Sequence, residues 1–309
     1  GNALCNSINK NLKYSHHVIE LSSFQLEYIK NFEPKISILL NLSKDHLDRY
    51  KNLKNYISAK KNIFNTGLDK VNLISLDDKY SRRIFHSNNI RNKISFSIKN
   101  TNANIYYNKG FIVDRYFYKY KNTKLSNISL DLVNKYNIQN ILAAYIVCKY
   151  LKIPIKFFKE SVNKFKGLPY RSSVIFNSKT KLIINNSKAT NISSALTTLE
   201  NKKNIYLILG GIAKEYEFEK FSNYQKDIRK IYIYGKSRFI INKQINLFKR
   251  SKILKNLYEV VNSLWDDLSS FDEKATIVFA PACASFDQFK NFEERGNYFN
   301  QLILKKINK

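Results

Sequence analysis

Side chains able to bind or activate a ligand follow short apolar stretches at five places along the chain. Glu20, His46, Lys188, Lys214 and Ser285 belong to these five groups. In an open sheet of parallel strands, ligands bind beyond the carboxyl ends of the strands, where loops and helix N-termini meet. Each residue alone has a simpler explanation, as a solvated strand end, a surface side chain or a helix cap. Their joint occurrence predicts a site for an anionic ligand.

Lys60 occupies an unusual position for a lysine. If residues 56–64 are helical, the side chains three and four positions away from Lys60 are all apolar or aromatic. A lysine there must extend its ammonium group to solvent, pair with an acid or lose its charge. Extension to solvent is the ordinary outcome. A covalently modified or metal-linked lysine is the alternative, because the neighbouring Lys61 falls in an exposed position.

Two features bear on nucleotide binding. Asn137 and Asn140 stand three positions apart near the start of a predicted helix, where Asn137 suits a helix cap and the two amides together suit a nucleobase or ribose. The nearest approach to a phosphate-binding G-x-x-x-x-G-K-[ST] loop ends in Gly235-Lys236-Ser237. Lys230 stands at the position where this loop requires its first glycine, so the pattern fails.

The elements that must position these residues indicate an α/β fold. Short apolar strands alternate with helical stretches, which is typical of largely parallel sheets. The predicted strands cover residues 17–20, 36–40, 71–75, 182–185, 205–209, 231–234 and 276–280. Ser22 with Gln25 and Ser285 with Gln288 have the spacing of capping boxes, which predicts a helix after each pair.

The middle of the chain indicates a division into two domains. Residues 93–133 contain several strand patterns with no helix between them, which predicts an antiparallel flap on the first sheet. Helices are predicted over 137–151 and 154–165. The Gly-Pro punctuation of residues 166–169 then predicts the connection between the domains.

The composition favours an ordinary enzyme over a nucleic-acid binder. The 309 residues include 53 Lys and Arg against 24 Asp and Glu, a formal charge of +29. Phosphate binding requires such charges on one face, with Arg prominent. Here most are Lys, spread evenly without blocks of like charge. A bias toward residues with A/T-rich codons, such as Lys, Asn and Ile, explains the excess better.

Three further observations bound the class of protein. The three cysteines, at positions 5, 148 and 283, are too few and too distant for a disulfide framework, which indicates a reducing compartment. The apolar runs fall far short of the roughly 20 residues that cross a bilayer. The chain begins with Gly1 rather than Met and shows no targeting pattern, so we expect a piece whose front is missing.

Five strings of residues together resemble the Mur ligases over the whole chain. They are E-L-S-S-F-Q-L-E from Glu20, D-H-L-D-R-Y from Asp45, L-P-Y-R ending at Arg171, N-S-K-A-T-N from Asn186 and P-A-C-A-S-F-D-Q-F from Pro281. The last two are most similar to the branch of the family that adds D-glutamate. They separate it from the branches that add other amino acids or the D-alanyl dipeptide, and from folylpolyglutamate synthase.

The resemblance implies a fold and a reaction. Residues 1–167 would be a P-loop-type central ATPase domain, incomplete at its N-terminus, and residues 168–309 a Rossmann-like C-terminal domain. ATP would phosphorylate the carboxylate of UDP-N-acetylmuramoyl-L-alanine, and the amine of D-glutamate would attack the acyl phosphate, with Mg²⁺ as the second cofactor. Such an enzyme is cytoplasmic and builds peptidoglycan, on which cell shape and division depend. We expect a monomer without nucleic-acid or membrane partners.

The resemblance also implies roles for individual residues. The metal and catalytic residues would be Glu20, His46 and Lys60, with Lys60 carbamylated. Adenosine and phosphate contacts would come from Asn137, Asn140, Arg171 and Asn186. The substrates would be bound by Asn2, Lys188, Thr190, Lys214, Ser285 and the backbone near Phe292, with Asn2 on the muramoyl substrate.

Some residues depart from the family pattern. Asn186 replaces a usual aspartate, Tyr136 replaces a common histidine, and Ala3-Leu4 follow Asn2. The uridine-nucleotide domain and the Walker-type loop are absent, so we expect this chain alone not to use ATP. A non-catalytic ligand-binding remnant stays open as an alternative, and a basic nucleic-acid binder as a third.

Overall fold

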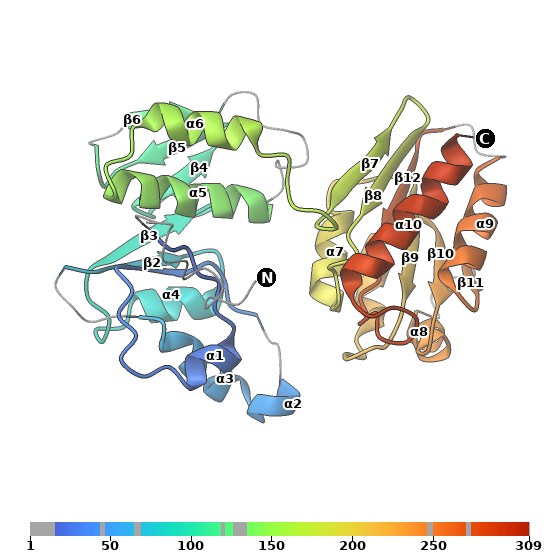
Figure 1. Ribbon diagram of the computed structural model, residues 1–309, viewed down its shortest axis with the longest axis horizontal. Helices are drawn as coiled ribbons and strands as arrows, with labels where there is room; N and C mark the ends of the chain where they lie inside the picture. The colour runs from blue at the N-terminus through green and yellow to red at the C-terminus, as the bar shows by residue number, and fades with distance from the viewer. Residues whose placement is uncertain are drawn as a thin grey trace, which may run out of the picture. The chain divides into compact units, whose positions relative to one another are not determined.

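The computed structural model describes residues 16–43, 47–64, 69–118, 121–125, 135–245, 250–269 and 273–308. The chain divides into two compact units, Gly1–Phe165 and Lys166–Lys309, and each unit contains its own six-stranded sheet (Figure 1). The division falls next to the predicted connection at residues 166–169. The α/β class is therefore confirmed, while the assignment of each unit to a named domain stays a prediction.

The sheet of the N-terminal unit combines a parallel part with an antiparallel flap. Its strands follow the order β1 (Ile36–Leu39), β2 (Val71–Ser75), β3 (Lys93–Ser97), β4 (Ile105–Asn108), β5 (Phe111–Asp114) and β6 (Lys121–Lys124). The first four run parallel, and β4, β5 and β6 pair antiparallel. The strands predicted at 36–40 and 71–75 and the flap are thus present.

Helices cover both faces of this first sheet. They are α1 (Ser23–Glu27), α2 (Leu47–Tyr50), α3 (Leu53–Lys61), α4 (Lys79–Phe85), α5 (Lys135–Tyr150) and α6 (Ile155–Lys164). Neighbouring strand residues point to opposite faces. Leu73 therefore packs in the core beneath α5 and α6, whereas Ile74 packs in the core with α3 and α4.

The sheet of the C-terminal unit is parallel except at one edge. Its order is β11 (Ser251–Ile253), β10 (Ile228–Tyr234), β9 (Ile205–Gly210), β12 (Ala275–Phe279), β8 (Lys181–Asn185) and β7 (Ser173–Asn177), and only β7 pairs antiparallel. The central strands are buried over their whole length, as continuous Ile, Leu and Val runs in a doubly covered sheet should be.

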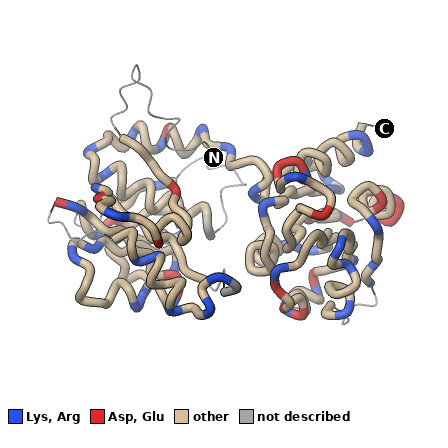
Figure 2. Tube along the Cα trace, turned by 60° about the horizontal axis from the view of Figure 1, so that its bottom comes forward, with Lys and Arg blue, Asp and Glu red and all other residues tan. Residues whose placement is uncertain are grey.

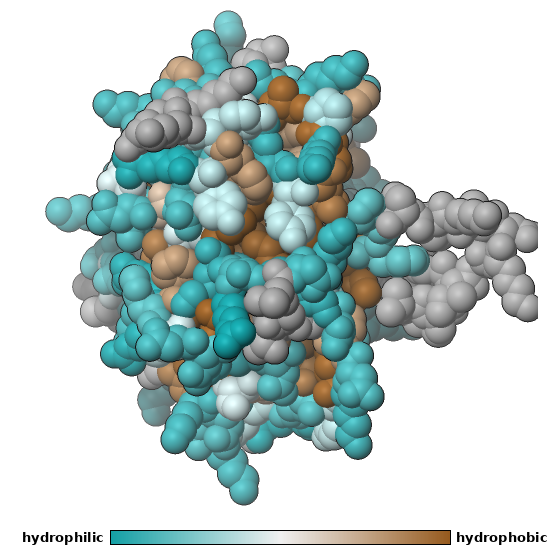
Figure 3. Space-filling model, turned by 90° about the vertical axis from the view of Figure 1, so that its left-hand side faces the viewer, coloured by the Kyte–Doolittle hydropathy of each residue, from teal (hydrophilic) through white to brown (hydrophobic). Residues whose placement is uncertain are grey.

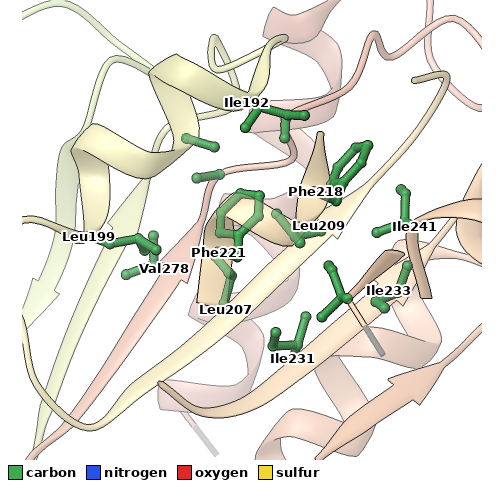
Figure 4. Close-up of a cluster of buried hydrophobic side chains, with 14 of the residues drawn as sticks. Ile192, Leu199, Leu207, Leu209, Phe218, Phe221, Ile231, Ile233, Ile241 and Val278 are labelled. Atoms are coloured by element: carbon green, nitrogen blue, oxygen red, sulfur yellow. The ribbon is translucent and has the colours of Figure 1, made fainter. Parts of the chain in front are cut away.

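Two separate cores hold the helices of the C-terminal unit against its sheet. One face packs α7 (Ile192–Leu199), the 3₁₀ helix η3 (Phe218–Tyr224) and α8 (Arg238–Gln244) onto β9, β10 and β12 (Figure 4). The other face packs α9 (Leu257–Leu268) and α10 (Phe292–Ile307). This sandwich fixes the strand ends, so the loops that leave them start from rigid positions.

Two local expectations about the N-terminal unit are wrong. Residues 17–20 form no strand, and Val18 is 98% exposed, so this short run lacks the burial that would stabilise one. Helix α5 begins at Lys135, so Asn137 lies inside the helix and does not cap it. The capping box of Ser22 and Gln25 is confirmed by its two reciprocal hydrogen bonds, 2.8 and 3.2 Å long.

The surface carries its charge in a dispersed form. Lys and Arg are scattered over both units rather than gathered in one stripe (Figure 2). The face of the N-terminal unit seen in Figure 3 is mostly hydrophilic, with apolar side chains visible between the polar ones, as is ordinary for a folded surface. Among the described helices, none combines the length and apolar character of a membrane span.

Candidate functional site

Four parallel strands of the C-terminal unit end side by side. Phe279 of β12 pairs with Asn185 of β8 and with Ile208 of β9, and Tyr234 of β10 pairs with Gly210 of β9. The segments that leave these strands therefore start at one edge of the sheet. We call this set the loop edge; it comprises residues 186–191, 211–217, 235–237 and 280–291.

Two segments of the loop edge are joined by backbone contacts. Ile212 and Ala284 form an isolated antiparallel bridge, with both N–H to O=C distances at 2.9 Å. At Gly211, whose φ is +126°, a side chain would collide with the carbonyl oxygen of Ala284. The bridge sets the segment of exposed Lys214 beside the segment of Ser285.

The segment after β8 contacts the start of α10 and the loop before β7. Ser187 Oγ donates to the carbonyl oxygen of Phe292 at 2.8 Å, and Lys188 Nζ lies 4.0 Å from the centroid of the Phe292 ring. The Lys188 amide donates to the Tyr170 carbonyl at 3.0 Å, beside the exposed Arg171. The loop edge and the start of α10 thus bring together the segments of five predicted substrate residues: Lys188, Thr190, Lys214, Ser285 and Phe292.

Asn186 and Ser285 are less accessible than their predicted roles suggest. Asn186 is 8% exposed, and its Nδ2 donates to Thr198 Oγ1 at 2.7 Å. Ser285 is 3% exposed. The expected capping box of Ser285 and Gln288 is wrong, because Gln288 Nε2 donates to the carbonyl of Lys255 at 2.9 Å. Helix α10 begins later, at Phe292, behind its N-cap Asn291.

One buried cation behind the loop edge was not predicted from the sequence. Arg295 of α10 is fully buried. Its guanidinium donates to Ser187 Oγ at 3.0 Å, to the Ser187 carbonyl at 2.7 Å and to the Cys283 carbonyl at 2.9 Å. Burial raises the pKa of the Cys283 thiol to about 12, although the nearby Arg295 charge opposes the rise. The sequence signal was its spacing from Phe299 and Leu302, which puts Arg295 on the buried stripe of the helix.

Only some of the predicted site residues of the N-terminal unit lie within the described residues. Glu20 is exposed ahead of α1, and Lys60 lies half-buried on α3, which Asn62 links to α1 through a 3.0 Å bond from its Nδ2 to the Leu26 carbonyl. Lys61 is half-buried as well, so the expected contrast with Lys60 is wrong. His46 and Asn2 lie outside the described residues.

A polar network at the strand ends of the N-terminal unit was also not predicted from the sequence. Gln139 is 4% exposed, and its Nε2 donates to Ser75 Oγ and to Asp77 Oδ2, both at 2.8 Å. Its Oε1 accepts from Asn41 Nδ2 at 3.3 Å. The network ties α5 to the carboxyl ends of β1 and β2. On the same helix Asn137 is half-buried and Asn140 exposed.

The described side chains form no ready-made metal site. Within those ranges no three His, Cys, Asp or Glu side chains come together as ligands for a metal ion. Glu20 offers an exposed carboxylate, but its predicted partner His46 lies outside these ranges. The described side chains alone therefore do not complete a Mg²⁺ site.

Comparisons with known proteins agree on one family. Residues 4–148 match the Mur ligase middle domain. The chain is 37% identical over 297 residues to the UDP-N-acetylmuramoylalanine--D-glutamate ligase of Rickettsia bellii, covering 93% of this chain and 64% of that protein. It is 32% identical over 286 residues to the protein of the same name from Staphylococcus aureus, covering 91% of this chain and 61% of that protein. The chain thus spans less than two thirds of these relatives.

Solved structures support the fold. MurF from Acinetobacter baumannii aligns with a TM-score of 0.61 at 13% identity, over 89% of this chain and 60% of that one. Folylpolyglutamate synthase from Thermotoga maritima aligns with a TM-score of 0.56 at 13% identity, over 88% and 61%. At such identities the likeness concerns the fold alone.

Proposed function

Because this chain belongs to the Mur ligase family, we propose that it serves the ATP-dependent joining of D-glutamate to UDP-N-acetylmuramoyl-L-alanine in peptidoglycan synthesis. The relatives named for this reaction align with 93% of the chain. The acting protein is a cytoplasmic monomer in this proposal.

The observation that carries the proposal is the convergence at the loop edge. A free dicarboxylate amino acid needs cations for its two carboxylates and acceptors for its ammonium group. Lys188 and Lys214 supply cations, and Thr190 and Ser285 supply hydroxyls, from segments that begin at neighbouring strand ends. Lys188 is also held beside the Phe292 ring, which orders its ammonium group.

The nucleotide contacts are assigned from the resemblance to the family. Asn137 and Asn140 would meet the adenosine and Arg171 its phosphates, whereas Asn186 has its amide hydrogen directed to Thr198. ATP would supply the phosphoryl group that activates the acceptor carboxylate. Glu20, His46 and Lys60 stay the proposed holders of Mg²⁺, with Lys60 carbamylated.

The test is a ligation assay with two forms of the protein. Radiolabelled D-glutamate, ATP and UDP-N-acetylmuramoyl-L-alanine are supplied to the chain alone and to the chain joined to the N-terminal third of the Rickettsia bellii relative. The proposal predicts labelled product with the joined form, and none when L-glutamate replaces D-glutamate. Binding of D-glutamate without any product from either form would favour a non-catalytic ligand-binding remnant.

A further inference from the structure

The buried guanidinium of Arg295 is hard to explain by stability alone. Arg295 is the largest fully buried side chain among the described residues. Removing a charge from water is costly unless it is paired. No carboxylate of the described part of the chain forms an ion pair with Arg295, and its three described bonds go to two carbonyls and one hydroxyl. A well-packed apolar residue would fill this place at lower cost.

The bonds of Arg295 join segments that are distant in sequence. Nε donates to the Oγ of Ser187 and Nη2 donates to its carbonyl oxygen, next to Lys188. Nη1 donates to the carbonyl oxygen of Cys283, two residues before Ser285. Ser187 Oγ in turn donates a hydrogen bond to the carbonyl oxygen of Phe292 at 2.8 Å. Only a planar fork with several N–H groups reaches such divergent acceptors at once.

We infer that Arg295 is a positioning residue, whose fork holds the segments 186–191 and 281–288 in register so that Lys188, Thr190 and Ser285 face one ligand. The inference rests on the proposed function only in naming that ligand as D-glutamate. Arg295 itself does not reach the reacting atoms. The neighbouring Gly296 lets α10 pack closely against Tyr170, since a side chain at position 296 would collide with the Tyr170 ring.

The test uses the full chain and amide hydrogen exchange. Arg295→Met removes charge and fork while keeping length, and Arg295→Lys keeps the charge without the fork. Both should speed exchange in 186–191 and 281–288 by roughly tenfold or more, the effect of losing one hydrogen bond to a charged group. Exchange in β9 should stay slow. Tyr232→Phe is the control, because it removes a buried hydroxyl bonded to Asp267 outside the loop edge.

Three results would overturn the inference. The first is unchanged amide exchange of the loops in a folded variant. The second is an equal acceleration of exchange in the loops and in β9. The third is loop exchange as slow in Arg295→Lys as in the unaltered chain. If Arg295→Met does not fold, Arg295→Lys gives the same comparison.

A parallel titration separates this inference from the proposed function. If the unaltered chain binds D-glutamate, both variants should weaken that binding about tenfold or more and weaken ADP binding much less. Equal weakening for both ligands would contradict the positioning role. If the unaltered chain does not bind D-glutamate although the variants open the loops, the ligand assignment fails and the role of Arg295 stands.

Discussion

The ammonium group of Lys188 lies 4.0 Å from the centroid of the Phe292 ring. The two residues come from segments about a hundred positions apart, and both belong to the predicted substrate set. Ser187 Oγ joins the same segments through the Phe292 carbonyl. A lysine held in this way is already ordered before a ligand arrives, which lowers the entropic cost of binding an anion.

Lys188→Ala should weaken D-glutamate binding by about tenfold or more, because it removes a half-buried cation from the loop edge. The free energy of unfolding should change by only about 1 kcal/mol, the worth of a cation–π contact. Calorimetric titration and urea unfolding measure the two effects. Lys181→Ala is the matched control, since Lys181 lies at the opposite end of β8 near the Trp265 ring. Equal losses of binding in both variants would refute the assignment.

Asn186→Asp should destabilise the C-terminal unit by about 1–3 kcal/mol, because it replaces a buried donor with a buried carboxylate. Thr198 Oγ1 accepts from Asn186 and itself donates to the Ser194 carbonyl at 3.2 Å. A double-mutant cycle with Asn186→Ala and Thr198→Ala should give a coupling of about 1 kcal/mol. A coupling of zero, with ADP binding lost in Asn186→Ala, would instead place Asn186 on the nucleotide.

Gln139→Leu and Asn140→Ala should separate stability from nucleotide contact. Gln139→Leu removes the two hydrogen bonds that Gln139 Nε2 donates to Ser75 Oγ and Asp77 Oδ2, which should cost about 1–3 kcal/mol of unfolding free energy. Asn140 is exposed, so its replacement should alter stability by less than about 0.5 kcal/mol. In ADP titrations of the protein joined to the N-terminal third of its relative, Asn140→Ala should weaken ADP binding more than Gln139→Leu does. A stability loss confined to Asn140→Ala would refute the network.

Asp267 should make the C-terminal unit less stable in acid. Burial alone would raise the pKa of Asp267, but hydrogen bonds from Lys230 and Tyr232, 2.7 and 2.6 Å long, outweigh it and hold the pKa below its ordinary value. The stabilisation is present above about pH 4 and is lost as pH falls through the lowered pKa.

The measurement is urea unfolding at neutral and acid pH. Asp267→Asn should lose about 1 kcal/mol at neutral pH and show a smaller further loss in acid than the unaltered chain. The neighbouring Asp266 is exposed, and Asp266→Asn should behave like the unaltered chain. An Asp267→Asn protein with an unchanged acid dependence would show that another group is responsible.

The sequence was most informative where burial is continuous. Strands β2 and β9 are mostly apolar and are buried on both faces, so their positions followed from the apolar runs in the sequence. The gathering of polar residues at strand ends followed from the geometry of parallel sheets. By contrast, residues 17–20 have apolar character without burial, and no local pattern distinguishes the two cases.

Long-range hydrogen bonds were the main obstacle to predicting the site. Ser285 and Gln288 have the same spacing as Ser22 and Gln25, yet the Gln288 amide bonds to Lys255, 33 positions away. Residue type alone does not point to Arg295 or Gln139, because charged and amide side chains are ordinarily solvated. Both lie on apolar helix stripes, so a search for polar residues at buried spacings would have found them.

The most direct test of the account is to follow the backbone amide signals of the isotopically labelled chain by nuclear magnetic resonance while D-glutamate is added. The account predicts saturable shifts at Lys188, Thr190, Ser285 and Phe292, and much smaller shifts with L-glutamate at the same concentrations. Shifts confined to other parts of the chain, or identical responses to the two enantiomers, would contradict it.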